Sequence, residues 1–165
     1  MRRLPLDHDD VRRRTAGRCF ICEIVKHNPQ VAHHVFYEDE LAIAFLSKYP
    51  SLYGYSLVAP REHLEHVTAD FAEEDYLALQ RVVWRVGRAL TQVVSTERLY
   101  VLSLGSQQAN RHVHWHVVPL PPGVPLPEQQ FAALNRADYL EIPESELARL
   151  ATRLRSELGA ASPPQ

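Results

Sequence analysis

The sequence is poor in cysteine, nearly neutral and free of long apolar runs. Two cysteines in 165 residues exclude a small domain held together by several disulfides. A formal net charge of -2 gives no general attraction to nucleic acid or to anionic lipid. Nowhere do about 18 apolar residues follow one another, as a membrane span requires, and the N-terminus lacks the apolar segment of a signal peptide. We therefore expect a soluble, cytoplasmic protein without a nucleic-acid or membrane partner.

The chain has the size and composition of one globular domain. With 45% hydrophobic residues over 165 positions, it is long enough to bury a proper core. Residues 1–18 are polar and arginine-rich, and we expect them to form an N-terminal extension. We assign the main domain to residues 19–126 and a C-terminal helical extension to residues 127–165, with a disordered tail after Ala160.

Five segments have the apolar, β-branched and aromatic composition of strands. They span residues 35–38, 41–46, 55–59, 98–104 and 112–119. The acidic pair Asp39-Glu40 separates the first two segments, which predicts a hairpin. Strands and helices are segregated along the chain more than they alternate. We therefore predict an α+β fold with a five-stranded antiparallel sheet and helices packed on one side.

Two segments have helical periodicity. Apolar residues recur at helical spacing over residues 71–94, which predicts a main helix of about 24 residues. We expect Thr68 or Asp70 to cap the N-terminus of this helix. The spacing resumes over residues 144–158 and predicts a C-terminal helix. Trp84, inside the main helix, is interpreted as a core residue.

Histidines alternate with apolar residues in the last predicted strand. Successive side chains of a strand point to opposite faces, so His112, His114 and His116 share one face at intervals of about 6.6 Å. The exposed face of a strand usually carries Thr, Ser, Lys or Glu, so three histidines in register favour a chemical role over chance. The residues that we expect to face the core are Val113, Trp115 and Val117.

Imidazole can perform both halves of a group transfer. In its neutral form it is a nucleophile, and its pKa of about 6.5 also suits a general acid or base. A histidine that attacks phosphorus through one nitrogen needs its other nitrogen held as N–H by an acceptor. We expect this acceptor to be a backbone carbonyl in the adjacent strand. The small polar residues from Gly105 to Asn110, directly before the histidines, would let backbone N–H groups reach phosphate oxygens.

The pair Cys19-x-x-Cys22 supplies half of a four-ligand zinc site. Two alternatives stay open on these residues alone, namely a thioredoxin-like redox pair and two unconnected thiols. The redox motif normally opens a helix after a strand, and no strong strand precedes Cys19. The other two ligands of a zinc site must come from elsewhere in the chain.

The histidine segment and several other landmarks resemble one known family. His112-Val113-His114-Trp115-His116-Val117-Val118 matches the His-φ-His-φ-His-φ-φ signature of the histidine triad family, and Gln108 stands where that family usually has a glutamine. Residues 19–24, 35–40 and 54–63 follow the landmarks of the family in order. The resemblance covers roughly residues 19–119. It implies an antiparallel sheet flanked by helices, usually paired into a homodimer.

The resemblance further implies hydrolysis or transfer of a nucleotide through a covalent intermediate on histidine. The expected reaction is cleavage of a phosphoramidate or of a phosphoanhydride, as in dinucleoside polyphosphates. His114 resembles the nucleophile, His116 the residue that contacts phosphate and assists proton transfer, and Gln108 the one that steadies the leaving-group oxygen. The residues that would line the phosphate pocket are Ser106, Gln107 and Asn110.

In zinc-containing branches of the family, the remaining metal ligands are a histidine after the third strand and the first histidine of the triad. These positions are His63 and His112, which together with Cys19 and Cys22 would complete a structural zinc site. His66 could replace His63 as the ligand if the local turn is helical. No organic cofactor is expected.

The sequence departs from the family pattern where an aspartate usually receives the ribose hydroxyls. Ser47 and Lys48 stand there instead, and we expect the serine to bond to the ribose and the lysine to meet a polyphosphate. Two alternatives to a hydrolase remain. One is a dinucleoside polyphosphate phosphorylase, in which inorganic phosphate resolves the intermediate, and the other is a nucleotide-binding regulatory module with weak activity.

Overall fold

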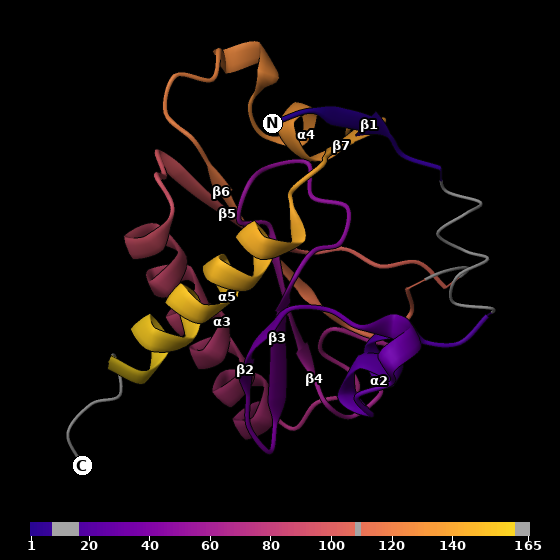
Figure 1. Cartoon of the computed structure of the whole chain (residues 1–165). Coiled ribbons are helices and arrows are strands. Elements are labelled where there is room, and N and C mark those ends of the chain that lie inside the picture. Colours follow the sequence, from indigo (N-terminus) through magenta and orange to yellow (C-terminus); the bar gives the residue numbers. More distant parts are fainter. Residues whose placement is uncertain (8–16, 108–109, 161–165) are drawn as a thin grey trace.

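A computed structural model of the chain describes residues 1–7, 17–107 and 110–160. It has an α+β fold around a five-stranded antiparallel sheet with the strand order β2-β3-β4-β6-β5 (Figure 1). All five predicted strands are present, and the predicted fold class is confirmed. The strands are β2 (Val35–Glu38), β3 (Ala42–Leu46), β4 (Ser56–Pro60), β5 (Arg98–Ser103) and β6 (Trp115–Leu120).

The last strand begins later than the histidine pattern predicts. β6 starts at Trp115, so the first two histidines of the triad lie in the segment that leads into it. The pairing of β6 with β4 ends where Val58 faces Trp115, and two residues further along β4 Pro60 has no N–H to continue the ladder. The N–H of Val113 donates instead to the carbonyl of Leu64 at 2.7 Å. The expectation of one regular strand through all three histidines was therefore wrong.

Two long helices cover one face of the sheet (Figure 1). They are α3 (Glu73–Val93) and α5 (Glu144–Ala160). Val113, Trp115 and Val117 belong to the buried cluster between these helices and the sheet, as the alternation predicts. None of the helices in the described ranges is long and apolar enough to cross a membrane.

α3 departs from the prediction at its N-terminus and on its outer face. Its N-cap is Ala72, which has no side-chain acceptor. Asp70 instead accepts hydrogen bonds from the N–H groups of Glu65 and His66 at 2.8 and 2.9 Å, so neither predicted residue caps the helix. Trp84 is 66% exposed, and its interpretation as a core residue was wrong. The buried stripe of the helix passes instead through residues 79, 82, 83, 86 and 90.

A short helix covers part of the opposite face, where no helix was expected. In α2 (Phe20–Val25), Ile21 and Ile24 are buried against Ile43 and Phe45 of β3. Because the side chains of β3 alternate between the two faces, this strand contributes to two separate cores. The packing of α2 also places the cysteine pair beside the sheet.

A second, two-stranded sheet joins distant parts of the chain. β1 (Arg3–Pro5) pairs antiparallel with β7 (Asp138–Leu140). The Arg3 guanidinium donates to the Asp138 carboxylate and to the Ser51 carbonyl, both at 2.9 Å. Neither strand was predicted, because three residues are too few to show a period. The remaining short helices are η1 (Pro29–Val31), η2 (Leu126–Glu128) and α4 (Phe131–Leu134).

The division of the chain into a main domain and two extensions stays a prediction. β1 lies in the predicted N-terminal extension and pairs with β7 in the predicted C-terminal one. α5, also in the C-terminal extension, contributes Leu150 and Leu154 to the main buried cluster. The tail predicted after Ala160 lies outside the described residues.

Candidate functional site

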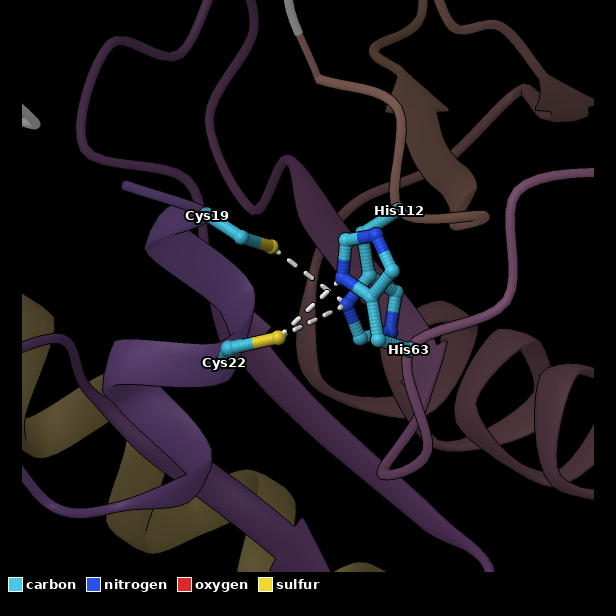
Figure 2. Close-up of side chains that lie close together, drawn as sticks. All are labelled: Cys19, Cys22, His63 and His112. Carbon is cyan, nitrogen blue, oxygen red and sulfur yellow. Dashed lines mark hydrogen bonds between the residues drawn. The ribbon is translucent and has the colours of Figure 1, made fainter. Parts of the chain in front are cut away.

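Four potential metal ligands converge from three parts of the chain. Cys19 and Cys22 lie at the start of α2, His63 follows β4, and His112 precedes β6. Their ligand atoms all lie within 4.8 Å of one another, and Figure 2 shows the four side chains facing one another. Cys19 Sγ is 3.4 Å from His112 Nδ1. Cys22 Sγ is 3.2 Å from His63 Nδ1 and 3.5 Å from His112 Nδ1.

This arrangement fits a tetrahedral zinc ion. Bonds of about 2.3 Å to sulfur and about 2.0 Å to nitrogen give ligand separations of roughly 3.3 to 3.8 Å, close to the three contacts above. Both imidazoles present Nδ1 to the cluster while oxygen holds Nε2. The partner of His112 is the Pro60 carbonyl at 2.9 Å, and that of His63 is the Glu65 carboxylate at 3.1 Å. Such oxygen partners orient metal-binding imidazoles. The cluster includes His63 and not His66.

The surroundings of the cysteine pair favour metal binding over redox chemistry. Burial and the neighbouring Cys19 raise the pKa of Cys22 to about 11. Both thiols face imidazole nitrogens of the cluster, an arrangement that favours a metal site over the redox alternative. A metal ion that binds Cys22 as a thiolate must displace its proton.

His114 and His116 form a second group, with ring centroids 4.7 Å apart. His114 is 2% exposed, and its Nδ1 lies 2.7 Å from the carbonyl oxygen of His112. A carbonyl only accepts hydrogen bonds, so Nδ1 carries the proton and Nε2 keeps its lone pair. The predicted backbone carbonyl is therefore present. It lies two residues earlier in the same segment, and the expectation that it belongs to the adjacent strand was wrong.

Burial keeps both imidazoles of this group neutral. It lowers the pKa of His114. Burial and the neighbouring His114 lower the pKa of His116 to about 4. A neutral His114 with a bare Nε2 is a competent nucleophile near neutral pH. The predicted nucleophile and a potential acid-base group thus lie side by side.

A tyrosine that the sequence pattern does not assign to catalysis contacts His116. The Tyr55 hydroxyl lies 3.0 Å from His116 Nδ1, and the two rings meet nearly perpendicularly, at 87°. The pairing of β4 with β6 sets Leu57 opposite His116. Tyr55, two residues before Leu57, is then a diagonal neighbour of His116 on the same face. Only the register of β4 against β6 identifies this residue, and that register cannot be read from the sequence alone.

An open cavity of about 420 Å³ adjoins the nucleophile. Its lining includes His114 together with Ser106 and Gln107, two of the residues predicted to hold phosphate. Glu65 and Arg111 contribute a carboxylate and a guanidinium that lie 3.8 Å apart. The cavity thus combines the nucleophile with polar groups of both charges.

The third residue of the predicted phosphate pocket, Asn110, and the predicted catalytic residue Gln108 are placed less directly. Asn110 is exposed, with a φ of 56°, a left-handed conformation that asparagine tolerates. The described lining of the cavity does not include it. Gln108 lies outside the described residues.

Aromatic side chains flank the nucleophile on the side of α2. The Phe20 ring lies 6.4 Å from the His114 ring. His33 packs 5.3 Å from Phe45 and 6.2 Å from Phe20, and burial lowers its pKa. These rings form an apolar wall beside His114.

The two residues at the ribose position follow β3. Ser47 is half-buried, and its Oγ accepts a hydrogen bond from the Tyr49 N–H at 3.3 Å. A local turn therefore already uses this oxygen. Lys48 is exposed, and its charge adds to the effect of burial in lowering the pKa of His33.

Comparisons with known proteins agree with this geometry. The sequence profile of the HIT domain matches residues 28–122. A relative from Schizosaccharomyces pombe, adenosine 5'-monophosphoramidase hnt1, is 29% identical over 132 residues. The match covers 71% of this chain and 92% of the relative.

Two solved structures share the fold. The hypothetical histidine triad nucleotide-binding protein ST2152 of Sulfolobus tokodaii superposes with a TM-score of 0.68 at 25% identity, over 86% of this chain and 93% of that one. A Zn-bound histidine triad family protein of Mycobacterium smegmatis has a TM-score of 0.65 at 22% identity, over 87% and 94% of the two chains. Because the HIT profile matches more than half of the chain, the protein belongs to the histidine triad, or HIT, family.

Proposed function

We propose that the protein is a nucleotide hydrolase or nucleotidyl transferase that cleaves phosphoramidate or phosphoanhydride bonds through a covalent intermediate on His114. The observation that carries this proposal is the 2.7 Å contact between His114 Nδ1 and the His112 carbonyl, which leaves Nε2 free to attack. His116 and the adjoining cavity supply a proton-transfer partner and room for a substrate. The name of the Schizosaccharomyces pombe relative supports the phosphoramidate class.

The proposed reaction consists of two displacements. Nε2 of His114 bonds to the α-phosphorus as the bond to the leaving group breaks, and the leaving atom keeps the electron pair and takes a proton. Water then attacks the phosphorus and frees His114. Ser106 and Gln107 of the cavity, with Asn110, are proposed to hold the phosphate oxygens, and Gln108 is proposed to steady the leaving-group or bridging oxygen.

The aromatic side of the nucleophile is proposed to receive the nucleoside. Phe20, Phe45 and His33 offer ring faces and edges there, and aromatic rings stack on any base. Ser47 and Lys48 are proposed as contacts for the ribose and for additional phosphates. Stacking alone does not select one base, so this assignment names a nucleotide and no particular base.

The cluster of two cysteines and two histidines is proposed to hold a structural zinc ion. When bound, the ion supplies a cross-link among α2, the segment after β4 and the segment before β6. Its ligands would be Cys19, Cys22, His63 and His112. His112 would then serve both parts of the site, because its imidazole is a ligand and its carbonyl holds His114. The Zn-bound Mycobacterium smegmatis relative supports this assignment. No organic cofactor is proposed.

A homodimer is proposed through the outer face of α3. Leu77 and Trp84 are 47% and 66% exposed, and with Gln80 and Arg81 they line a hollow on the helix surface. Exposed large apolar side chains one heptad apart share a helix face and are typical of a surface that a partner covers. Trp84→Glu is expected to turn a wild-type dimer into a monomer in sedimentation velocity. A monomeric wild type would contradict this part of the proposal.

The decisive experiment is turnover of a substrate panel combined with detection of the intermediate. The protein is incubated with adenosine phosphoramidates and dinucleoside polyphosphates, with and without inorganic phosphate, and then examined for an acid-labile nucleotidyl adduct. Wild type should turn over at least one class and form an adduct that His114→Ala lacks. Release that requires inorganic phosphate would identify a phosphorylase. The absence of both turnover and adduct would contradict the proposal of an enzyme and would favour the alternative of a nucleotide-binding regulatory module.

A further inference from the structure

The two transfer histidines have different partners at the same ring atom. Nδ1 of His114 faces the carbonyl of His112 at 2.7 Å, whereas Nδ1 of His116 faces the hydroxyl of Tyr55 at 3.0 Å. A carbonyl only accepts a hydrogen bond, but a hydroxyl both donates and accepts. The carbonyl therefore holds His114 in one tautomer with a bare Nε2. The hydroxyl can bond to His116 in each of its protonation states.

We infer that Tyr55 is the positioning residue of His116, which it holds with Nε2 toward the reacting phosphate while allowing that nitrogen to give and to take a proton. This inference rests on the proposed function, since it assigns a partner to the proton-transfer histidine of the same site. Tyr55 acts through His116 and is not itself a reacting group.

The fold fixes the place of the Tyr55 phenol. β4 pairs with β6 in a register that sets Leu57, two residues after Tyr55, opposite His116. The Tyr55 side chain packs against two buried clusters, one under α2 and one that contains Leu52 and Val118. Burial raises the pKa of Tyr55 to about 12, so the hydroxyl keeps its proton at neutral pH. A neutral hydroxyl is what a partner that both donates and accepts requires.

The proton balance of the two displacements uses the Tyr55 hydroxyl as an acceptor, because Nδ1 of His116 keeps its proton in both steps. In the first, the bond from His114 Nε2 to phosphorus forms and the bond to the leaving atom breaks. The leaving atom keeps the electron pair and receives the Nε2 proton of protonated His116, which becomes neutral and keeps its Nδ1 proton in a hydrogen bond to the Tyr55 oxygen. In the second, His116 Nε2 takes a proton from the attacking water, and His114 keeps the electron pair of the broken bond. A bound anionic phosphate favours protonated His116, against the effect of burial.

The test compares Tyr55→Phe with wild type on two substrates that differ in their need for a proton. The departing nitrogen of an adenosine 5'-phosphoramidate of an alkylamine needs a proton, whereas the p-nitrophenyl ester of AMP releases a stable anion. We expect Tyr55→Phe to lower the single-turnover rate of adduct formation by roughly 10- to 100-fold with the phosphoramidate and by less than about 3-fold with the ester. An equal loss with both substrates, or no loss with either, would overturn the inference.

Tyr53→Phe is the matched control. It also removes a half-buried hydroxyl, one that donates to Glu146 of α5 at 2.6 Å. Both rates should be unchanged in this variant, because its lost hydrogen bond lies on the other face of the sheet. A wild type that forms no adduct contradicts the proposed function. An active wild type with an unimpaired Tyr55→Phe contradicts only the role of Tyr55.

A measurement on the wild type keeps the inference testable if Tyr55→Phe does not fold. Nitrogen NMR spectra of protein with labelled histidines report the protonation and hydrogen bonding of each ring nitrogen. We expect Nδ1 of His116 to be hydrogen-bonded in both its neutral and its protonated state. A His116 Nδ1 that is bonded only to water would overturn the inference.

Discussion

The site has two halves: the metal half holds the proposed zinc ligands, and the transfer half holds the two histidines proposed for group transfer. They share the segment from His112 to His116 but depend on different features of it. The metal half gathers two cysteines and two histidines whose ligand atoms lie within 4.8 Å of one another. The transfer half consists of His114 and His116, whose roles depend on what each Nδ1 faces. One residue type is thus proposed to serve as a ligand, a nucleophile or an acid according to the partner of its second nitrogen.

The largest expected effect comes from removing the side chain of His114, which belongs to the transfer half alone. His114→Ala should abolish adduct formation and lower turnover by on the order of 10⁴-fold or more, because no other group supplies the nucleophile. Zinc content should stay stoichiometric, since the His114 side chain is not in the metal cluster. Single-turnover assays and metal analysis check both halves. Loss of zinc from this variant would show that the halves are not separable.

The next effect comes from breaking the metal half. His63→Ala should reduce bound zinc to below about half an equivalent and lower the melting temperature by about 10 °C. The lost ligand opens a cluster that ties α2 to the sheet. His66→Ala, which changes a residue outside the cluster, should retain zinc and melting temperature. Metal analysis and calorimetry make the comparison, and the opposite pattern would transfer the ligand role to His66.

A smaller effect is expected from Glu65, which contacts the proposed metal ligand His63 but is not itself in the cluster. Glu65 faces His63 Nε2 at 3.1 Å, so Glu65→Gln should weaken zinc affinity by about 10-fold, as measured by competition with a chelator. Glu62→Gln, at an exposed position nearby, is the control and should bind zinc as wild type does. Equal affinities in both variants would rule out the carboxylate as the orienting partner.

The smallest expected effect concerns the transfer half and pH. Burial lowers the pKa of His116 from 6.5 to about 4, so the unfolded chain takes up the proton before the native protein does. The free energy of unfolding should therefore be highest above about pH 6.5 and fall as the pH drops toward 4. In zinc-free protein, urea unfolding of His116→Gln should show a shallower fall than wild type. Parallel curves for the two proteins would contradict this origin.

Much of the fold could be predicted because it rests on periodicity. The five strands and two long helices carry apolar residues at periods that one sequence shows. β1 and β7 were missed because three residues have no period. The prediction that Trp84 lies in the core was wrong because a large apolar side chain can be covered by the core of its own chain or by a partner. The sequence alone does not distinguish these two cases.

The two halves of the site differ in how far the sequence predicts them. The C-x-x-C spacing and the family resemblance together named all four proposed ligands, and the structure brings them together. Tyr55 and Glu65 were not named, because their contacts depend on strand register and on the path of a loop. The His112 carbonyl was missed as well, since a backbone oxygen has no signature in the sequence.

The pairing of β1 with β7 has a consequence for the order of folding. Arg3 and Asp138 are 135 positions apart, and the entropic cost of closing a loop grows with its length. During synthesis β1 has no partner until most of the chain has left the ribosome, whereas the main sheet needs only residues up to Leu120. In pulse-labelled hydrogen exchange during refolding, the N-terminal strand should therefore gain protection later than the strands of the main sheet.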